Sequence, residues 1–217
     1  MKIFRYIVEL VYPWKCVFCD CVLQNGELCD ECSKTLPYTR GDSIYQKFPF
    51  VEKCVSPLYY KDSVRASIHR YKFYGCSAYC KEYGRLMAEC VENNLDCGGI
   101  NMVSWIPLSK KRLRTRGYDQ AYLLAREISR TVDLPCVQTL KKVKNNAAQS
   151  TTRDAKQRRS NVAGAYELLP GADVDGKYVL LVDDVVTTGS TLSEAARVLK
   201  KAGAKGVYCV TLARHED

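Results

Sequence analysis

The chain has 217 residues, a hydrophobic fraction of 47% and a formal net charge of +9 at pH 7. This length and composition allow one main domain with a substantial core and one small accessory module. No apolar run approaches the ~20 residues that a membrane-spanning helix needs, which excludes insertion into a membrane and predicts a soluble protein.

The chain contains twelve cysteines, which would suggest a disulfide framework if the protein were secreted. Residues 1–12, however, alternate apolar side chains with Lys2, Arg5 and Glu9 and lack the apolar core of a signal peptide. We therefore expect reduced thiols and a cytoplasmic location.

Four of these cysteines form two closely spaced pairs near the start of the chain. Cys16-x-x-Cys19 and Cys29-x-x-Cys32 are separated by nine residues, in a stretch too short to bury a core of its own. Two thiolate pairs at this spacing can form a tetrahedral zinc site, and so short a segment needs a metal ion or a similar cross-link to be stable. We predict a zinc knuckle over residues 1–40, with Zn²⁺ in a structural role. A redox dithiol and unliganded thiols are the alternatives.

The rest of the chain, residues 41–217, is predicted to form one α/β domain. From residue 100 onward apolar strands alternate with amphipathic helices, which is the pattern of a parallel sheet flanked by helices. The elements that we expect in chain order are an extended segment at 54–60, a helix at 75–93, a strand at 102–106, a helix at 121–128, an edge strand at 136–140, a strand at 178–182, a helix at 192–199 and a strand at 207–212.

Positive charge is concentrated in residues 101–162, which contain fourteen basic and four acidic residues. This excess favours contact with an anionic partner, either a polyphosphate ligand or a nucleic acid. A solubilising face is the simpler alternative. Within the segment, residues 141–161 interrupt the order of strands and helices, and at that length they predict a functional loop or mobile lid.

The most informative motif follows the apolar strand at 178–182. Asp183 and Asp184 stand at its carboxyl end, and a hydroxyl-rich loop then opens the next helix with Thr187, Thr188, Gly189, Ser190 and Thr191. Free N–H groups at a helix N-terminus bind phosphate, and glycine lets the backbone approach it closely. Two adjacent carboxylates can accept hydrogen bonds from a diol or bind a hydrated divalent cation. The sequence therefore predicts a site for a phosphorylated sugar.

Two other interpretations of this motif exist. The residues could form only a strand end, a turn and a helix cap. An apolar strand that ends in Asp-Asp also suits an NTPase, but the chain contains no Gly-x-x-x-x-Gly-Lys-[Ser/Thr] loop, which argues against that class.

The stretch VLLVDDVVTTGST (179–191) resembles the ribose-phosphate signature of type I phosphoribosyltransferases. The resemblance implies the fold of that family and 5-phosphoribosyl-1-pyrophosphate as the ligand. It assigns Asp183 and Asp184, as the catalytic acids, to the ribose hydroxyls, and the loop 187–191 to the 5-phosphate. The implied reaction displaces pyrophosphate from C1 through an oxocarbenium-like state, with Mg²⁺ bridging the leaving group, so catalysis would rest on positioning and electrostatics.

A wider match covers most of the chain. The stretches LVYPWKCVFC (10–19), WIPLSKKRLRTRGYDQAYLLA (105–125) and RRSNVAGAY (158–166) together resemble the ComF family of competence-associated phosphoribosyltransferase-like proteins. In the wider fold the loop after the first parallel strand binds pyrophosphate, and the residues at that place here are Ser109, Lys110 and Lys111.

The sequence also departs from the pattern of the ComF family. Asp119 stands where Asn is usual, and an expected Arg-x-Arg-x-Thr is replaced by Lys142, Lys144 and Asn146. Lysine keeps the positive charge of arginine but lacks its bidentate fork.

Three functions follow from these observations. The first is transfer of phosphoribosyl to an unidentified nitrogen nucleophile. The second, implied by the ComF resemblance, is a single-stranded DNA-binding accessory of DNA uptake with competence-machinery proteins as partners. The third is a module that senses the sugar pyrophosphate without turnover. The residues expected to contact nucleic acid are Arg112, Arg114, Arg116, Lys141, Lys142 and Lys144, with Trp105, Tyr118 or Tyr122 for stacking.

Overall fold

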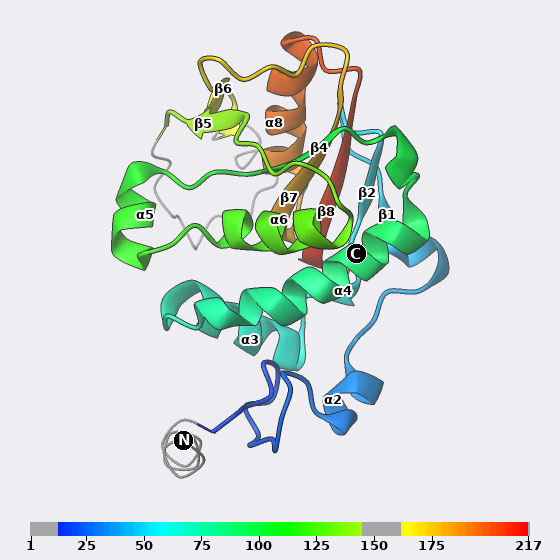
Figure 1. Ribbon diagram of the computed structural model, residues 1–217, viewed down its shortest axis with the longest axis vertical. Coiled ribbons are helices and arrows are strands. Elements are labelled where there is room, and N and C mark those ends of the chain that lie inside the picture. Colours follow the sequence, from blue (N-terminus) through cyan, green and yellow to red (C-terminus); the bar gives the residue numbers. More distant parts are fainter. Residues whose placement is uncertain (1–12, 145–161, 217) are drawn as a thin grey trace.

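The computed structural model describes residues 13–144 and 162–216. A six-stranded sheet lies at its centre in the order β1-β2-β8-β7-β4, with β3 also paired to β8 (Figure 1). All strand pairs in it are parallel except β1 with β2, which confirms the expected parallel α/β architecture. The strands are β1 (Tyr45–Gln46), β2 (Lys53–Val55), β3 (Leu58–Tyr59), β4 (Met102–Trp105), β7 (Tyr178–Val186) and β8 (Gly206–Arg214).

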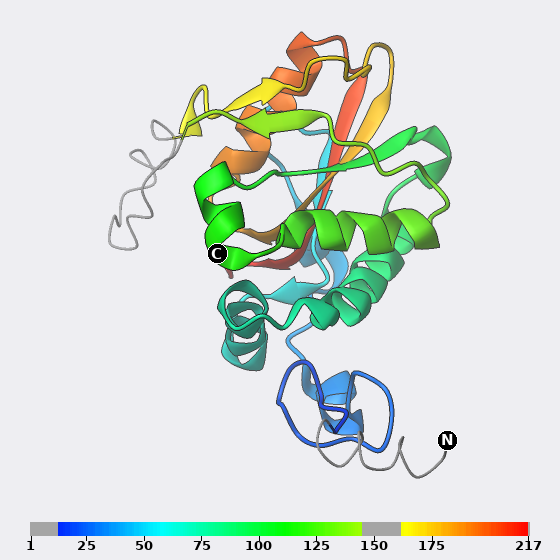
Figure 2. The ribbon, with the colours of Figure 1, turned by 60° about the vertical axis from the view of Figure 1, so that its left-hand side comes forward.

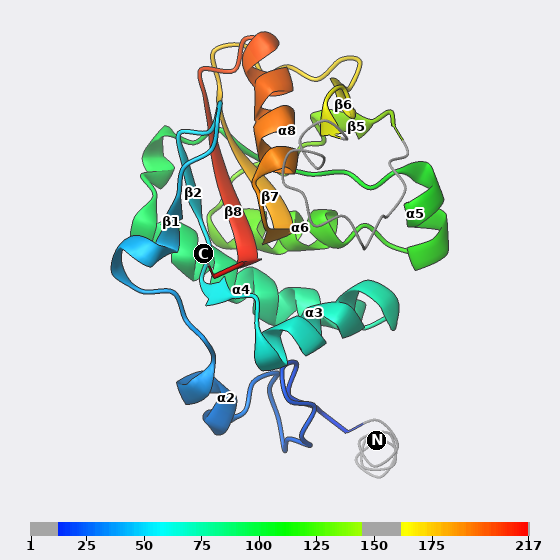
Figure 3. The ribbon, with the colours of Figure 1, turned by 180° about the vertical axis from the view of Figure 1, so that it is seen from behind.

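Helices cover both faces of this sheet. On one face lie α4 (Cys80–Asn94) and α6 (Gln120–Thr131), and on the other lies α8 (Ser190–Lys201) (Figures 1 and 3). Helix α3 (Asp62–Phe73) lies beside α4, beyond the carboxyl ends of β7 and β8. The short helix α5 (Lys110–Arg116) stands apart at one end and buries none of its residues. The described residues also contain three short 3₁₀ helices: η1 (Gly41–Ile44), η2 (Ser77–Tyr79) and η3 (Cys97–Gly99).

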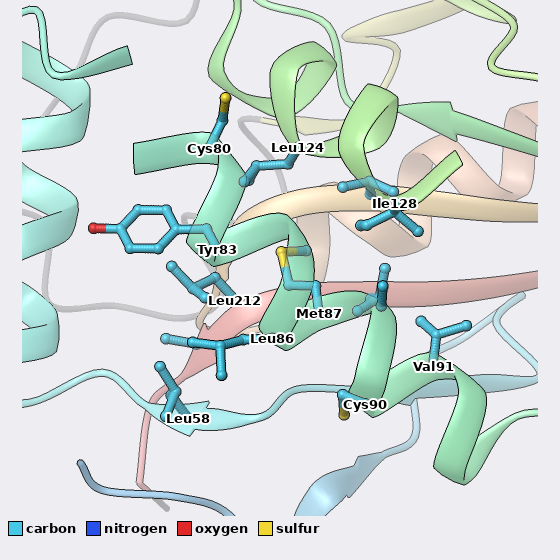
Figure 4. Close-up of a cluster of buried hydrophobic side chains, with 14 of the residues drawn as sticks. Leu58, Cys80, Tyr83, Leu86, Met87, Cys90, Val91, Leu124, Ile128 and Leu212 are labelled. Atoms are coloured by element: carbon cyan, nitrogen blue, oxygen red, sulfur yellow. The ribbon is translucent and has the colours of Figure 1, made fainter. Parts of the chain in front are cut away.

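The core follows from the alternation of apolar side chains along β7. Leu180 and Val182 belong to the cluster under α3, α4 and α6, whereas Val179 and Leu181 belong to the cluster under α8. Because successive side chains of a strand point to opposite faces, a continuous apolar run is what a strand covered on both sides requires. Figure 4 shows the first cluster, in which α4 contributes Tyr83, Leu86 and Met87, α6 contributes Leu124 and Ile128, and β8 contributes Leu212.

The close packing of α4 on α6 depends on Gly84. A Cβ atom at this position would collide with the Cβ of Glu127, so only glycine allows the two backbones to approach as they do.

Three expectations for the first part of the domain need correction. The extended segment expected at 54–60 is two strands, β2 and β3, which both pair with β8. The helix expected from residue 75 begins only at Cys80, after η2, and the helix α3 was not predicted. The chain between Lys61 and Phe73 mixes charged, polar and apolar residues, which obscures its helical period.

The prediction of an edge strand at 136–140 is wrong. Only Cys136 bridges to the sheet, opposite Val103, before the chain turns away. Leu140 begins a different strand, β5 (Leu140–Lys142), which pairs antiparallel with β6 (Tyr166–Leu168) in a separate two-stranded sheet. The side-chain hydroxyls of Ser104 and Thr139, 2.7 Å apart, fix the point at which the chain leaves the sheet.

The N-terminal module lies beyond α3 and α4 (Figure 2). Its described part contains one short helix, α2 (Asp30–Thr35), and otherwise loops. Val17 and Phe18 are buried in the same cluster as α3 and α4, and the rings of Phe18 and Tyr83 lie 5.6 Å apart. The module is therefore anchored to the main domain by packing. None of the helices in the described residues is long and apolar enough to span a bilayer.

Candidate ligand site and four-cysteine cluster

The residues that were predicted to bind the sugar and the pyrophosphate lie at the same edge of the sheet. Strands β4 and β7 are parallel neighbours with Trp105 opposite Val182, and the N–H of Ile106 donates to the carbonyl of Val182 at 3.0 Å. Because the carboxyl ends of parallel strands meet at one edge, the loop after β4 and the acids that end β7 lie close together. The structure thus brings the two predicted halves of the site to one place.

Asp184 is paired with a lysine that the sequence did not single out. The Nζ atom of Lys72, at the end of α3, lies 2.6 Å from Asp184 Oδ1. Asp184 is only 4% exposed, and its second oxygen, Oδ2, is buried without a hydrogen-bond partner among the described residues. A buried carboxylate oxygen without a partner is costly. It is therefore a natural acceptor for a ligand hydroxyl.

Asp183 is partly exposed beside it and accepts a hydrogen bond from the N–H of Asp184 at 2.8 Å. Burial of its carboxyl group, together with the negative charge of Asp184, raises the pKa of Asp183 to about 8, although the charges of Lys72 and Lys142 oppose the rise. Asp183 therefore holds its proton more tightly than an ordinary aspartate.

The hydroxyl-rich loop opens α8 as predicted. Gly189 precedes the helix with φ +67°, and the helix start has no side-chain cap from residues 13–144 or 162–216. The hydroxyls of Thr188 and Ser190 lie 2.8 Å apart, so both side chains are turned toward one point. A Cβ at Gly189 would collide with the ring of Phe48, and the positive φ also favours glycine. The free N–H groups and converging hydroxyls suit a phosphate group.

Open hollows flank this loop on both sides of Phe48. One, of about 720 Å³, is lined by Thr187, Thr188 and Lys47 among others. The other, of about 390 Å³, is lined by Thr188, Ser190 and Ala163 among others. A small phosphorylated ligand can therefore reach the loop from solvent.

The loop after β4 is fixed by two side-chain caps. Ser109 accepts from the N–H of Arg112 at 3.4 Å and starts α5. Asp119 Oδ1 accepts from the N–H groups of Ala121 and Tyr122 at the start of α6, and Oδ2 accepts from the N–H of Leu108 at 3.0 Å. Burial raises the pKa of the Asp119 carboxyl, and these hydrogen bonds oppose the rise. The residue that departs from the ComF pattern thus ties the expected pyrophosphate loop to α6.

Basic side chains surround this loop. Lys110, Lys111, Arg112 and Arg114 are exposed on α5, and Arg116 is partly buried. Positive charges in the first turn of a helix oppose its dipole, so Lys110 and Lys111 do not stabilise α5. An anionic ligand would offset this cost.

The three lysines expected in a common DNA-binding cluster have different surroundings. Lys142 is half-buried with its Nζ 3.2 Å from the hydroxyl of Tyr166, and burial with the charge of Arg112 lowers the pKa of its ammonium. Lys141 pairs with Glu167 at 2.9 Å, and Lys144 donates to the carbonyl of Ala163 at 2.8 Å. Lys142 also lies close enough to Asp183 to influence its charge. Asn146 and the remainder of the expected loop, 145–161, lie outside the described residues.

The aromatic residues considered for base stacking are mostly covered. Trp105 is 8% exposed, and the hydroxyl of Tyr118 donates to the carbonyl of Tyr71. Tyr122 is 37% exposed, and its ring packs against Trp105. An exposed group that the sequence did not single out lies instead on α3 and just after it. There the ring of His69 contacts the rings of Phe73 and Tyr74, and Arg116 lies 5.1 Å from the ring of Phe73.

The four cysteines of the two pairs are gathered in one cluster. The sulfur atoms of Cys16, Cys19, Cys29 and Cys32 all lie within 4.8 Å of one another, and those of Cys19 and Cys29 are 3.7 Å apart. Four thiolates around Zn²⁺ at ~2.3 Å would be roughly 3.8 Å apart, so the donor set fits a tetrahedral zinc ion. All twelve cysteines are free thiols. Within the described residues, no other group of three or more such side chains is placed to bind a metal.

Comparison with known proteins finds a family match in the C-terminal half of the chain. The family described as "Phosphoribosyl transferase domain" matches residues 115–217, which include β7, α8 and β8. Strand β4, the loop that follows it and α3 therefore lie outside the matched range. The match gives the C-terminal half the phosphoribosyltransferase fold that the motif predicted.

Relatives match over nearly the whole length of the chain. "Competence protein F" of Haemophilus influenzae is 30% identical over 207 residues, which cover 92% of this chain and 90% of that protein. "DNA utilization protein YhgH" of Escherichia coli K12 is 32% identical over 229 residues, covering 94% and 99%. Among solved structures, glutamine phosphoribosylpyrophosphate amidotransferase of B. subtilis aligns with 62% of this chain and 26% of its own, at 21% identity and a TM-score of 0.43.

Proposed function

Because the chain belongs to the ComF family of competence proteins with a phosphoribosyltransferase domain, we propose that it binds 5-phosphoribosyl-1-pyrophosphate at the carboxyl edge of β4 and β7. The observation that carries this proposal is the buried, unpartnered Oδ2 of Asp184, next to the uncapped start of α8. A ligand that presents hydroxyls at one end and a phosphate at the other fits both features.

The ligand contacts follow from the positions of these groups. Asp183 and Asp184 accept the ribose hydroxyls, and the backbone N–H groups and hydroxyls of residues 187–191 donate to the 5-phosphate. Ser109, Lys110 and Lys111 bind the pyrophosphate from the loop after β4, and Lys142 faces it from β5. Mg²⁺ bound with the pyrophosphate would neutralise part of its charge, and the carboxylate oxygens of the acid pair are donors that suit a hydrated ion.

Transfer of the phosphoribosyl group is the reaction that this arrangement supports. The bond from C1 to the pyrophosphate oxygen breaks, a bond from C1 to a nitrogen of the acceptor forms, and that nitrogen loses its proton. The side chains of this chain fix the ribose and stabilise the departing charge. Incubation with the sugar pyrophosphate and candidate nitrogen acceptors, scored by pyrophosphate release, tests it. Tight binding of the sugar pyrophosphate without release of pyrophosphate would favour a sensing module over an enzyme.

Zinc in the four-cysteine cluster is part of the proposal, as is the boundary of the module at residue 40. Four thiolate donors at tetrahedral spacing suit a structural site with no open position. The ion would fix the two loops that carry the cysteines.

Twelve free thiols agree with a reducing compartment, so we place the protein in the cytoplasm.

A second function, binding of single-stranded DNA, is favoured by the exposed rings of His69, Phe73 and Tyr74. Phe73 is 62% and Tyr74 69% exposed, and Arg116 joins this group to the basic side chains of α5. Exposed rings beside positive charge bind bases by stacking and the backbone by charge. The names of the relatives, which refer to competence and DNA utilization, agree with this role.

Fluorescence anisotropy with a labelled oligothymidylate tests the DNA proposal. Phe73→Ala with Tyr74→Ala should weaken binding by about tenfold, since one stacked base contributes roughly 1–3 kcal/mol. Arg112→Gln with Arg114→Gln should reduce the dependence of affinity on salt. Absence of salt-sensitive binding by the unaltered protein would refute it.

A further inference from the structure

Helix α3 connects the four-cysteine cluster to the candidate ligand site. At the cluster, Arg70 Nη2 donates to the carbonyls of Val17 and Phe18 at 3.0 and 2.8 Å, and the hydroxyl of Ser67 also donates to Val17. Val17 and Phe18 are the two residues between Cys16 and Cys19. The helix therefore binds the backbone of the first metal-binding loop directly.

The end of the same helix is attached to the ligand site. Two residues after Arg70, Lys72 forms its 2.6 Å ion pair with Asp184. Between them, the hydroxyl of Tyr71 donates to the carbonyl of Gln120 at 2.9 Å, and the carbonyl of Tyr71 accepts from the hydroxyl of Tyr118. These contacts tie the last turn of α3, which carries both Arg70 and Lys72, to the start of α6.

We propose that Lys72 is a positioning residue of the ligand site, and that the four-cysteine module keeps it in place through Arg70. The inference rests on the proposed binding of the sugar pyrophosphate and adds a residue from outside the matched domain, residues 115–217. Lys72 holds the Asp184 carboxylate by Oδ1 and leaves Oδ2 for the ligand. Without this cation the negative charge of Asp184 would face an anionic ligand with no ion pair to offset it.

The carbonyls that Arg70 binds belong to the loop that carries Cys16 and Cys19, whose order would depend on a bound metal. Structural zinc sites gather their loop only when the ion is bound, so metal binding and local folding are one equilibrium. Loss of the ion would release Val17 and Phe18 from Arg70 and loosen α3. By linkage, a ligand that favours the ordered α3 must also strengthen metal binding, by the same factor. The two sites are therefore coupled in both directions.

The role of Lys72 is tested by calorimetric titration of 5-phosphoribosyl-1-pyrophosphate into the zinc-loaded full chain. Lys72→Met should weaken binding by at least about tenfold, and Lys72→Arg should restore it to within about threefold, because a cation rather than packing is needed. The matched control is Arg65→Met, which removes an exposed charge from the same helix. Metal content should be unchanged in all three variants.

The role of the module is tested by competition for zinc with a chromogenic chelator, with and without saturating sugar pyrophosphate. In the unaltered chain the ligand should raise the apparent zinc affinity by about fivefold or more. Arg70→Met should retain one zinc and lose that increase. The inference would be overturned, and the proposed function would stand, if the ligand raised the zinc affinity of Arg70→Met as much as that of the unaltered chain. Unchanged ligand affinity in Lys72→Met would have the same consequence. An unaltered chain that binds no sugar pyrophosphate would overturn the proposed function as well.

Discussion

The carboxylate of Asp119 joins two parts of the ligand site that are separate in the sequence. One oxygen caps α6 by accepting from Ala121 and Tyr122, and the other accepts from the N–H of Leu108 at 3.0 Å. An asparagine could do only one of these, because its amide nitrogen would face an N–H donor. The aspartate therefore stabilises the loop that is proposed to bind pyrophosphate.

Replacement of Asp119 by asparagine should loosen that loop selectively. We expect affinity for 5-phosphoribosyl-1-pyrophosphate to fall about fivefold to tenfold and stability by about 1 kcal/mol, the usual contribution of one hydrogen bond. Affinity for ribose 5-phosphate, which lacks the pyrophosphate, should not change. Calorimetric titrations with the two ligands measure the difference. An equal loss for both ligands would contradict the assignment of the loop.

Two neighbouring lysines of β5 should behave differently. Lys142 is half-buried near Asp183, whereas Lys141 pairs with Glu167. Lys142→Met should weaken sugar pyrophosphate binding by about tenfold, and Lys141→Met should leave it unchanged, although both remove one positive charge. The same titration measures both variants. Equal effects would show that the net charge of the segment matters and the position of Lys142 does not.

The raised pKa of Asp183 predicts a stability cost at high pH. A carboxyl group with a pKa of about 8 in the folded state and about 4 in the unfolded state binds its proton more tightly when folded. Its favourable contribution is full below pH 4 and is lost as the pH rises to 8. Asp183→Asn has no such group, so its melting temperature should exceed that of the unaltered chain by an amount that grows between pH 5 and 8.

The comparison of the two melting curves at each pH cancels the titration of the groups that do not interact with Asp183. Each 1 kcal/mol corresponds to roughly 2–4 °C for a chain of this size. A difference that stays constant with pH would show that Asp183 titrates normally.

Metal binding by the four-cysteine cluster has a matched control within the same module. Protein purified without chelator should contain about one zinc per chain, and Cys16→Ser should lose it. Cys21→Ser should retain it, since Cys21 is not part of the cluster. Elemental analysis decides, and Cys16→Ser with full metal content would contradict the assignment.

The elements with a strong local signal were predictable from the sequence. Strand β7 is an uninterrupted apolar run, and α8 carries Leu192, Ala195, Ala196 and Leu199 at helical spacing. The acids and the hydroxyl-rich loop follow one another directly between these two elements. The proximity of the two acids to the hydroxyl-rich loop could therefore be predicted from this stretch of sequence alone.

The contribution of α3 could not be predicted in the same way. Lys72 reaches Asp184 across 112 positions of sequence, and nothing near either residue indicates the pair. The edge strand expected at 136–140 failed for a related reason. The pairing of this segment depends on which strand lies beside it. Its end, β5, pairs with β6, which follows residues 145–161 in the sequence.

The most direct test of the ligand site compares two double variants that make the same pair of aspartate-to-asparagine changes. Asp183→Asn with Asp184→Asn alters the carboxyl end of β7, and Asp173→Asn with Asp175→Asn alters the loop before the same strand. Calorimetric titration with 5-phosphoribosyl-1-pyrophosphate should give the second variant the dissociation constant of the unaltered chain. The first should bind at least about a hundredfold more weakly, because both carboxyl groups that would hold the ribose hydroxyls are lost, with unchanged circular dichroism. An unchanged dissociation constant in the first variant would contradict the proposed site.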